Sequence, residues 1–192
     1  MELPTRTETK CWTKECIHSE FDLPIYFNEE KTELEEHIKI DLELNVGDNP
    51  LYNKLLEPIK DTANIILEIG IGDFKDKNGG SLLLWRKYFT KADICGVDIL
   101  PENRVLDILV NDEKVILFTE KDAYNQNFVD EYLKEFKFDF ILDDGPHTLE
   151  SQKKFIELYL PLLSKNGILI IEDIPNISWI NEFKKITPSN LQ

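Results

Sequence analysis

Residues 64–72 read Asn-Ile-Ile-Leu-Glu-Ile-Gly-Ile-Gly, and this stretch decides the fold class. The nearly continuous apolar run Asn64–Ile69 is typical of a strand that is buried on both faces of a sheet. Gly70 and Gly72 follow it, and glycines at a strand end let the backbone approach a ligand closely. The pattern predicts a parallel strand with a binding site at its carboxyl end.

Outward from this strand, strands and helices alternate along the chain. Further strands are predicted at Asp93–Val97, Lys114–Phe118, Phe138–Leu142 and Gly167–Ile171. Helices are predicted at Tyr52–Ile59, Ser81–Phe89, Asn127–Phe136, Leu149–Leu163 and Ser178–Phe183. Parallel neighbours need crossover connections, which helices provide, so the alternation predicts an α/β fold with a doubly wound, mostly parallel sheet.

The N-terminal part differs from the rest of the chain in composition and in hydrophobic periodicity. Residues 51–192 carry the alternating pattern and are expected to form one domain, which suits a chain of 192 residues. Residues 1–50 are rich in acids and show little periodicity beyond one expected helix near Thr32–Ile40. They are interpreted as an N-terminal extension, either a lid over a substrate pocket or a solvated arm.

Charge and cysteine content narrow the partners. The net charge of −15 disfavours nucleic acid, because binding to phosphates depends on Lys and Arg. No apolar run is long enough to span a bilayer, and Met1–Lys10 lacks a signal-peptide core, so a cytoplasmic location is expected. The three cysteines are then expected to be reduced, and Cys11 and Cys16 have no second pair to complete a zinc site.

Acidic residues stand at several predicted strand ends, where open α/β sheets bind ligands. Glu68 lies in the first strand just before its glycines. Asp98 follows the second strand and is placed to accept hydrogen bonds from ribose hydroxyls. Asp122 follows the third strand, where an adenine amino group would lie, and Asp143 follows the fourth.

The charge of these residues separates two cofactor classes. A dinucleotide site has a third glycine and a helix N-terminus at its pyrophosphate, and here the loop Asp73–Gly80 stands in its place. Glu68 and Asp73 would repel a pyrophosphate, but they would attract the positive sulfonium of S-adenosylmethionine. A glycine-rich strand end can also be only a turn, so the interpretation depends on acids at three consecutive strand ends.

A second acidic group is predicted beside the first. Residues 138–147 read Phe-Asp-Phe-Ile-Leu-Asp-Asp-Gly-Pro-His, and residues 167–174 read Gly-Ile-Leu-Ile-Ile-Glu-Asp-Ile. Adjacent parallel strands lie roughly 4.8 Å apart, so Asp144, Glu172 and Asp173 are expected to share one space. A hard divalent cation such as Mg²⁺, Mn²⁺ or Ca²⁺ would relieve the repulsion between these three carboxylates.

His147 and Asp144 are the candidate catalytic residues. A bound cation would chelate two neighbouring substrate hydroxyls and lower the pKa of one of them, and His147 would take its proton. The simpler alternatives are that the acids cap helices or face solvent, and that His147 is an ordinary loop residue.

These motifs together resemble those of the class I S-adenosylmethionine-dependent methyltransferases. The stretches are Ile66-Leu-Glu-Ile-Gly-Ile-Gly72, Gly79-Gly-Ser-Leu-Leu-Leu-Trp-Arg86 and Gly96-Val-Asp-Ile99. The resemblance is strongest to the sugar O-methyltransferases of macrolide tailoring, of the mycinamicin 2-hydroxyl type, which share the Asp-Asp-Gly-Pro-His and Ile-Glu-Asp-Ile stretches. It covers roughly residues 47–174.

The resemblance implies roles for residues of this chain. It implies that Asp144, Glu172 and Asp173 hold magnesium and that His147 is the base. It further implies cofactor contacts from Glu68, Gly70, Ser81, Asp98 and Asp122. Pro50 stands where the family often has histidine, the family's additional N-terminal domain is not recognisable, and the usual C-terminal hairpin is missing from the pattern. The resemblance leaves a homo-oligomer open.

The leading hypothesis is therefore a metal-assisted O-methyltransferase for a sugar hydroxyl or a similar small polyol. Two alternatives remain open at the level of sequence. One is a methyltransferase for another acceptor, such as a catechol-like phenol, a protein or an RNA. The other is a catalytically degenerate domain that serves as a scaffold, which the short C-terminus favours.

Overall fold

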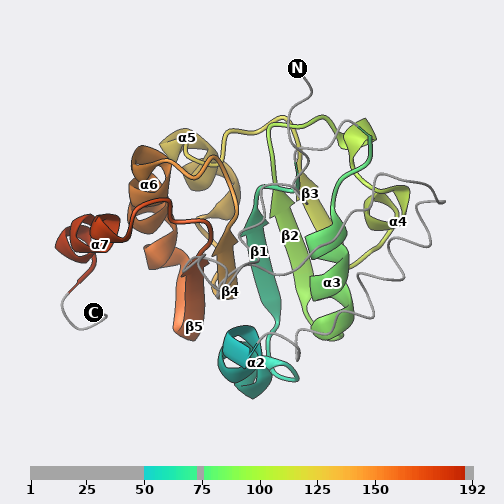
Figure 1. Cartoon of the computed structure of the whole chain (residues 1–192). Coiled ribbons are helices and arrows are strands. Elements are labelled where there is room, and N and C mark those ends of the chain that lie inside the picture. The colour runs from blue at the N-terminus through green and yellow to red at the C-terminus, as the bar shows by residue number, and fades with distance from the viewer. Residues whose placement is uncertain (1–49, 73–75, 189–192) are drawn as a thin grey trace.

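Five parallel strands form the centre of the molecule in the computed structural model, which describes residues 50–72 and 76–188. The strands stand in the order β3-β2-β1-β4-β5 (Figure 1). Their bounds are β1 Ile65–Ile69, β2 Asp93–Val97, β3 Val115–Phe118, β4 Phe138–Asp143 and β5 Leu163–Ile171. Every pairing is parallel, so the predicted sheet type is confirmed.

Short helices connect the strands. The α-helices are α2 Pro50–Leu56, α3 Gly80–Tyr88, α4 Asp107–Val110, α5 Gln126–Phe128, α6 Leu149–Tyr159 and α7 Ile180–Ile186. The 3₁₀ turns are η3 Glu57–Ile59, η4 Glu102–Arg104, η6 Leu160–Leu162 and η7 Ile177–Trp179, and η5 Val129–Leu133 is a π-helix. None of the helices among these residues is long and apolar enough to cross a membrane.

Among the helices, two predicted ones end earlier than expected, and one observed turn was not predicted. The helix predicted at Asn127–Phe136 is a single turn of α5 followed by a π-helix that ends at Leu133. The helix predicted to reach Leu163 ends at Tyr159, because Pro161 has no N–H to continue the ladder and the chain tightens into a 3₁₀ turn. No helix was predicted at Asp107–Val110, which forms one short turn.

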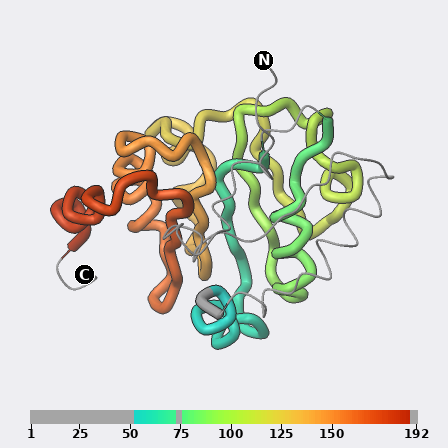
Figure 2. The backbone as a smooth tube through the Cα atoms, viewed as in Figure 1, coloured from blue at the N-terminus to red at the C-terminus, as the bar shows by residue number. Residues whose placement is uncertain are grey.

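Two apolar clusters cover the two faces of the sheet. Neighbouring residues of β1 show the division, because Ile66 belongs to the same cluster as Trp85 of α3 and Leu67 belongs to the same cluster as Phe155 of α6. Helices α2, α3 and α4 belong to the first cluster, and α5, α6 and α7 belong to the second. In Figure 2, α6 and α7 lie together on the side of the sheet where β4 and β5 stand.

The strand ends are aligned by the register of the sheet. Ile69 of β1 pairs with Val97 of β2 and with Asp143 of β4, and Asp143 pairs with Ile171 of β5. The backbone hydrogen bonds continue one residue further, as in Asp144 N–H to Ile69 O at 2.9 Å. The residues that follow these strands therefore meet at one edge, as the sequence predicts.

Some predictions lie outside the described residues. These are the N-terminal extension up to residue 49, with its helix near Thr32–Ile40, and Asp73 in the loop after β1. Between β5 and residue 188 the structure places η7 and α7 and no antiparallel hairpin.

Candidate functional site

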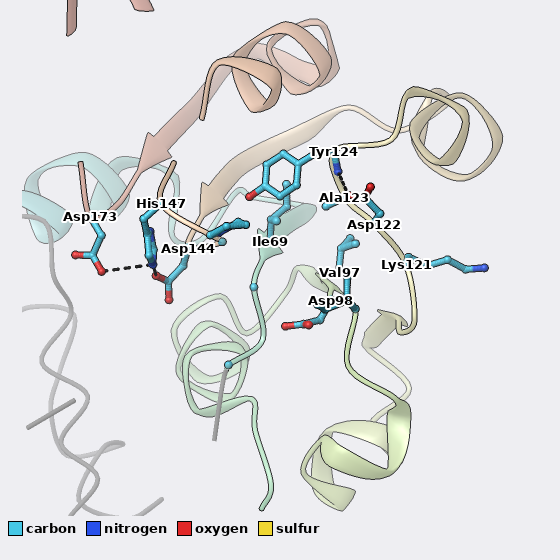
Figure 3. A pocket seen from close by; sticks show the side chains of 15 residues that line it. Ile69, Val97, Asp98, Lys121, Asp122, Ala123, Tyr124, Asp144, His147 and Asp173 are labelled. Carbon is cyan, nitrogen blue, oxygen red and sulfur yellow. Dashed lines mark hydrogen bonds and ion pairs between the residues drawn. The ribbon is translucent and has the colours of Figure 1, made fainter. Parts of the chain in front are cut away.

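A cleft of about 680 Å³ opens at the carboxyl ends of the strands. Its walls come from the ends of β1, β2 and β4, from the segment after β3, and from Asp173 after β5 (Figure 3). The lining residues that the sequence singled out are Gly70, Gly72, Asp98, Asp122, Asp144, His147 and Asp173. The edge of the sheet that the strand pattern predicted is therefore hollowed into a binding-sized space.

Gly70 is required where β1 leaves the sheet. Its φ of 90° is left-handed, and a Cβ added there would lie 2.1 Å from the backbone oxygen of Asp144. A backbone atom cannot move aside as a flexible side chain can. Glycine at this position thus allows the β1 and β4 ends to lie close together and to form one wall of the cleft.

Asp98 fixes two loops with one carboxylate. Its Oδ2 accepts a hydrogen bond from the N–H of Ile71 at 2.6 Å, and its Oδ1 accepts one from the N–H of Leu100 at 2.9 Å. In Figure 3 the Asp98 side chain points toward Asp144, whereas Lys121 points away from the other labelled residues. A preorganised acceptor that is half-buried at the cleft wall suits ribose hydroxyls.

Asp122 lies further along the same wall and is exposed. Its Oδ1 accepts a hydrogen bond from the N–H of Tyr124 at 2.9 Å, so the turn after β3 is held in shape by its own acid. Tyr124 also lines the cleft and was not singled out from sequence. An aromatic residue two positions after a strand-end acid was the available signal.

Three predicted cofactor residues lie behind the cleft wall and do not line it. Glu68 is 1% exposed, and its carboxylate accepts hydrogen bonds from the hydroxyl of Ser81 and from Nε1 of Trp85. Asp143 is 2% exposed and accepts one from the hydroxyl of Tyr124. Because these side chains are bound to neighbouring protein groups, direct contact of Glu68, Ser81 and Asp143 with a cofactor stays a prediction.

Burial dominates the charge state of Asp143. Loss of solvent raises the pKa of this carboxyl to about 6, although the Tyr124 hydroxyl and His147 oppose the shift. Burial also raises the pKa of Tyr124, and the neighbouring Asp143 raises it further. The tyrosine hydroxyl is therefore a neutral donor to this acid near neutral pH.

Asp144, His147 and Asp173 form a compact cluster at the other end of the cleft. One ligand atom of each lies within 4.8 Å of the others, which is close enough for all three to contact one cation. Nε2 of His147 lies 3.6 Å from a carboxylate oxygen of Asp144 and 3.6 Å from one of Asp173. His147 and Asp173 both have left-handed backbones, with φ of 54° and 48°. Such strain at non-glycine residues is typical of functional sites.

Glu172 lies beside this cluster but not within it. The side chain is 5% exposed and accepts a hydrogen bond from the hydroxyl of Tyr52. Burial raises the pKa of Glu172 well above its ordinary value, and the nearby charge of Asp144 raises it further. The hydrogen bond from Tyr52 opposes this shift. Burial and the charge of Glu172 also raise the pKa of Tyr52.

The predicted acidic trio is therefore divided by the structure. Asp144 and Asp173 converge as expected, His147 joins them, and the side chain of Glu172 is bound to Tyr52 of α2. The charges of Asp144 and Asp173 add to the rise in the pKa of Glu172, and a divalent cation would relieve this repulsion. The carboxylate oxygens of Asp144 and Asp173 suit Mg²⁺ or Mn²⁺, and His147 lies next to them.

Comparison with known proteins identifies relatives with named reactions. No family model matches the chain. A tetracenomycin-C rhamnosyl 3'-O-methyltransferase of Streptomyces olivaceus is 30% identical over 128 residues, or 65% of this chain and 31% of the relative. L-olivosyl-oleandolide 3-O-methyltransferase of Streptomyces antibioticus is 31% identical over 134 residues, or 67% of this chain and 32% of the relative. The chain thus spans about a third of the length of the curated relatives that it matches.

A solved structure shows the same fold. The MycE methyltransferase from the mycinamycin pathway, in complex with Mg, SAH and mycinamycin VI, aligns with a TM-score of 0.58 and 23% identity. The alignment covers 74% of this chain and 37% of MycE. The resemblance predicted from the strand-end motifs is confirmed: this chain has the class I methyltransferase fold and is similar in sequence to sugar O-methyltransferases.

Proposed function

We propose that this chain carries the catalytic domain of an S-adenosylmethionine-dependent, metal-assisted O-methyltransferase acting on a sugar hydroxyl or a similar small polyol. One observation carries the proposal. The cleft at the strand ends has two carboxylates along one wall, Asp98 and Asp122, that can accept hydrogen bonds from a nucleoside. The Asp144–His147–Asp173 cluster lies at the other end of the cleft. A cofactor and a hydroxylated acceptor could thus lie side by side in one space.

The cofactor end is assigned by hydrogen-bonding capacity and charge. Asp98 is proposed to accept hydrogen bonds from the ribose, and Asp122 from the adenine amino group. Gly70 and Gly72 leave room for close backbone approach. Glu68, Ser81 and Asp143 complete the predicted set from behind the wall. The negative charge concentrated here favours a sulfonium ligand and disfavours a pyrophosphate.

The metal end is assigned to Asp144, Glu172 and Asp173. When bound there, a divalent cation lowers the pKa of a hydroxyl that it contacts. His147 is proposed to accept the hydroxyl proton at Nε2. The substrate oxygen then forms a bond to the methyl carbon while the carbon–sulfur bond breaks, which leaves a neutral thioether. Positioning of the two reactants in the cleft supplies much of the remaining acceleration.

The acceptor class follows from the relatives. Their names describe methyl transfer to rhamnosyl and olivosyl hydroxyls, and MycE was crystallised with the glycoside mycinamycin VI. A glycoside is therefore the small-molecule partner that we propose. The net charge of −15 favours it over a nucleic acid.

Methyl transfer and cofactor binding test this proposal separately. Titration calorimetry with S-adenosylhomocysteine should show binding, and transfer to a panel of deoxysugar glycosides should require Mg²⁺ or Mn²⁺. Asp144→Asn should lower turnover at least 100-fold, whereas Glu131→Gln, at an exposed position on η5, should leave it unchanged. Transfer to catechol or to a capped oligonucleotide, but to no glycoside, would contradict the acceptor class. No cofactor binding at millimolar concentration would favour the scaffold hypothesis.

A further inference from the structure

We propose that Tyr52 is a positioning residue for the proposed metal site. From helix α2, its hydroxyl holds the carboxylate of Glu172 in place. The inference rests on the proposed function, because it takes Glu172 as a metal ligand. Tyr52 is 120 residues away in sequence and lies in α2, outside the strand-end motifs. Its hydroxyl donates to Oε1 of Glu172, and both side chains are buried.

The backbone of Glu172 is held at both ends by other elements. Its N–H donates to the carbonyl oxygen of Asp143 at the end of β4, at 3.0 Å. Its own carbonyl oxygen accepts a hydrogen bond from Nε2 of Gln152 in α6, also at 3.0 Å. The Tyr52 bond holds its side chain as well. The direction of the carboxylate therefore depends on the direction of the tyrosine hydroxyl.

The ring of Tyr52 is itself fixed in place. It is fully buried and stacks on Trp85 with a centroid distance of 5.8 Å and an interplanar angle of 30°. Trp85 is held in turn by its hydrogen bond to Glu68 and by an edge-to-face contact with Phe140 at 5.2 Å. A rigid aromatic pair thus links the carboxylate of Glu172 to the carboxylate of Glu68 in β1.

A tyrosine hydroxyl suits this role chemically. A lysine or arginine at position 52 would also hold the carboxylate, but its positive charge would offset the negative charge that attracts a dication. The hydroxyl binds the anionic carboxylate and adds no charge. Groups that orient metal ligands in this way commonly change metal affinity 10- to 100-fold when they are removed.

The test compares two phenylalanine variants of the full chain. Tyr52→Phe removes the hydroxyl and keeps the ring that stacks on Trp85. Tyr88→Phe is the matched control, because the Tyr88 hydroxyl also donates to a carboxylate, that of Glu57 at 3.1 Å, from the same apolar cluster but away from the cleft. Mn²⁺ binding is measured by electron paramagnetic resonance with S-adenosylhomocysteine present, and folding by near-ultraviolet circular dichroism.

The outcomes separate the inference from the proposed function. Tyr52→Phe should remain folded and bind Mn²⁺ roughly 10-fold more weakly, with a changed Mn²⁺ spectrum, whereas Tyr88→Phe should match wild type. In a Glu172→Asp background, where the shortened carboxylate withdraws from the hydroxyl, adding Tyr52→Phe should cost little more affinity. Equal Mn²⁺ binding by Tyr52→Phe and wild type would overturn the inference alone, and so would unfolding of Tyr52→Phe in both the presence and absence of metal. Absence of Mn²⁺ binding by wild type would overturn the proposed metal site, and the inference with it.

Discussion

Gly145 and Tyr124 are packed so closely that any side chain at position 145 would collide with the Tyr124 hydroxyl. A Cβ added to Gly145 would lie 2.0 Å from the Tyr124 hydroxyl oxygen, which donates to Asp143. We therefore expect Gly145→Ala to push Tyr124 away from Asp143 and to destabilise the fold by about 1–3 kcal/mol. Urea unfolding of the variant and the wild type measures this cost.

The same contact predicts a rescue. Tyr124→Phe removes the atom that the new methyl group would strike, so the double variant Gly145→Ala/Tyr124→Phe should be more stable than the sum of the single changes predicts. The coupling should be at least about 0.5 kcal/mol. Strictly additive free energies of unfolding would show that the two side chains do not meet as described.

Asp143 predicts a pH dependence of stability. Burial raises its pKa in the folded state to about 6, above the unfolded value, so folding favours the protonated acid. The contribution of Asp143 to the free energy of unfolding is fully present below about pH 4 and is lost as the pH rises through about 6. Asp143→Asn stays neutral and keeps an oxygen for the Tyr124 hydroxyl. In metal-free protein, the stability of wild type relative to this variant should therefore fall by roughly 1–3 kcal/mol between pH 4 and 7.

Chemical denaturation of both proteins at several pH values, with a chelator present, checks this expectation. Tyr159→Phe provides a control, since its hydroxyl is buried and donates to the carbonyl of Ala123 at 2.7 Å. That variant should keep the pH profile of wild type. A flat difference between wild type and Asp143→Asn would mean that Asp143 is ionised throughout this range in both states.

The sequence predicted most of the residues that line the cleft, but it did not predict how deeply each candidate side chain is buried. Asp98, Asp144, His147 and Asp173 line the cleft as predicted, because strand ends in a parallel sheet meet at one edge. The burial of Glu68 could not be predicted in the same way, since its partners Ser81 and Trp85 come from a separate helix. Side-chain partners across layers are a property of packing, which strand patterns do not carry.

At the scale of secondary structure, helix α6 connects the segments after β4 and β5 that carry the proposed metal site. It begins directly after His147 with a capping box formed by Thr148 and Ser151. One turn later, Gln152 donates to the carbonyl oxygens of Glu172 at 3.0 Å and Asp173 at 3.4 Å. The helix thus determines where the segment after β5 lies relative to the end of β4.

Gln152→Leu should weaken this connection. The change keeps a side chain of similar size but leaves buried carbonyl oxygens without their donor, which costs about 1–3 kcal/mol. Because those carbonyls belong to Glu172 and Asp173, Mn²⁺ binding should weaken as well. Calorimetric unfolding and Mn²⁺ titration measure the two effects. The control Gln126→Leu, at an exposed position in α5, should change neither stability nor Mn²⁺ binding. Wild-type metal affinity in Gln152→Leu would show that α6 does not position the metal ligands.

Strand prediction was more accurate for a strand with neighbours on both sides than for one at the edge of the sheet. The predicted bounds of the second strand, Asp93–Val97, are those observed for β2, which lies between β1 and β3. The predicted fifth strand began at Gly167, but β5 begins at Leu163. β5 pairs only with β4 within the described sheet, and its early residues include the half-buried Ser164 and the exposed Lys165 and Asn166. Polar residues at a sheet edge resemble a loop, which explains the late start.

For the whole molecule, Cys95 reports on the cooperativity of the fold. It lies in β2 with no exposed surface, between Leu67 of β1 and Ile116 of β3. Burial raises the pKa of its thiol to about 12, and the charge of Asp93 adds to this. Since the thiolate is the reactive form, both access and ionisation protect Cys95 in the folded protein. Reaction with iodoacetamide at pH 8 therefore requires opening of the sheet.

Ligands should slow this reaction if they bind the folded chain. A ligand present at about 100 times its Kd stabilises the folded state by about 2.7 kcal/mol, which lowers the population of the open form roughly 100-fold. Alkylation of the Cys95 peptide, followed by mass spectrometry, should therefore slow by a similar factor with S-adenosylhomocysteine at that concentration. It should slow further when Mn²⁺ is added as well, if both ligands bind the folded chain. Rapid alkylation without denaturant would contradict the buried position of β2, and an unchanged rate with both ligands would contradict binding to this fold.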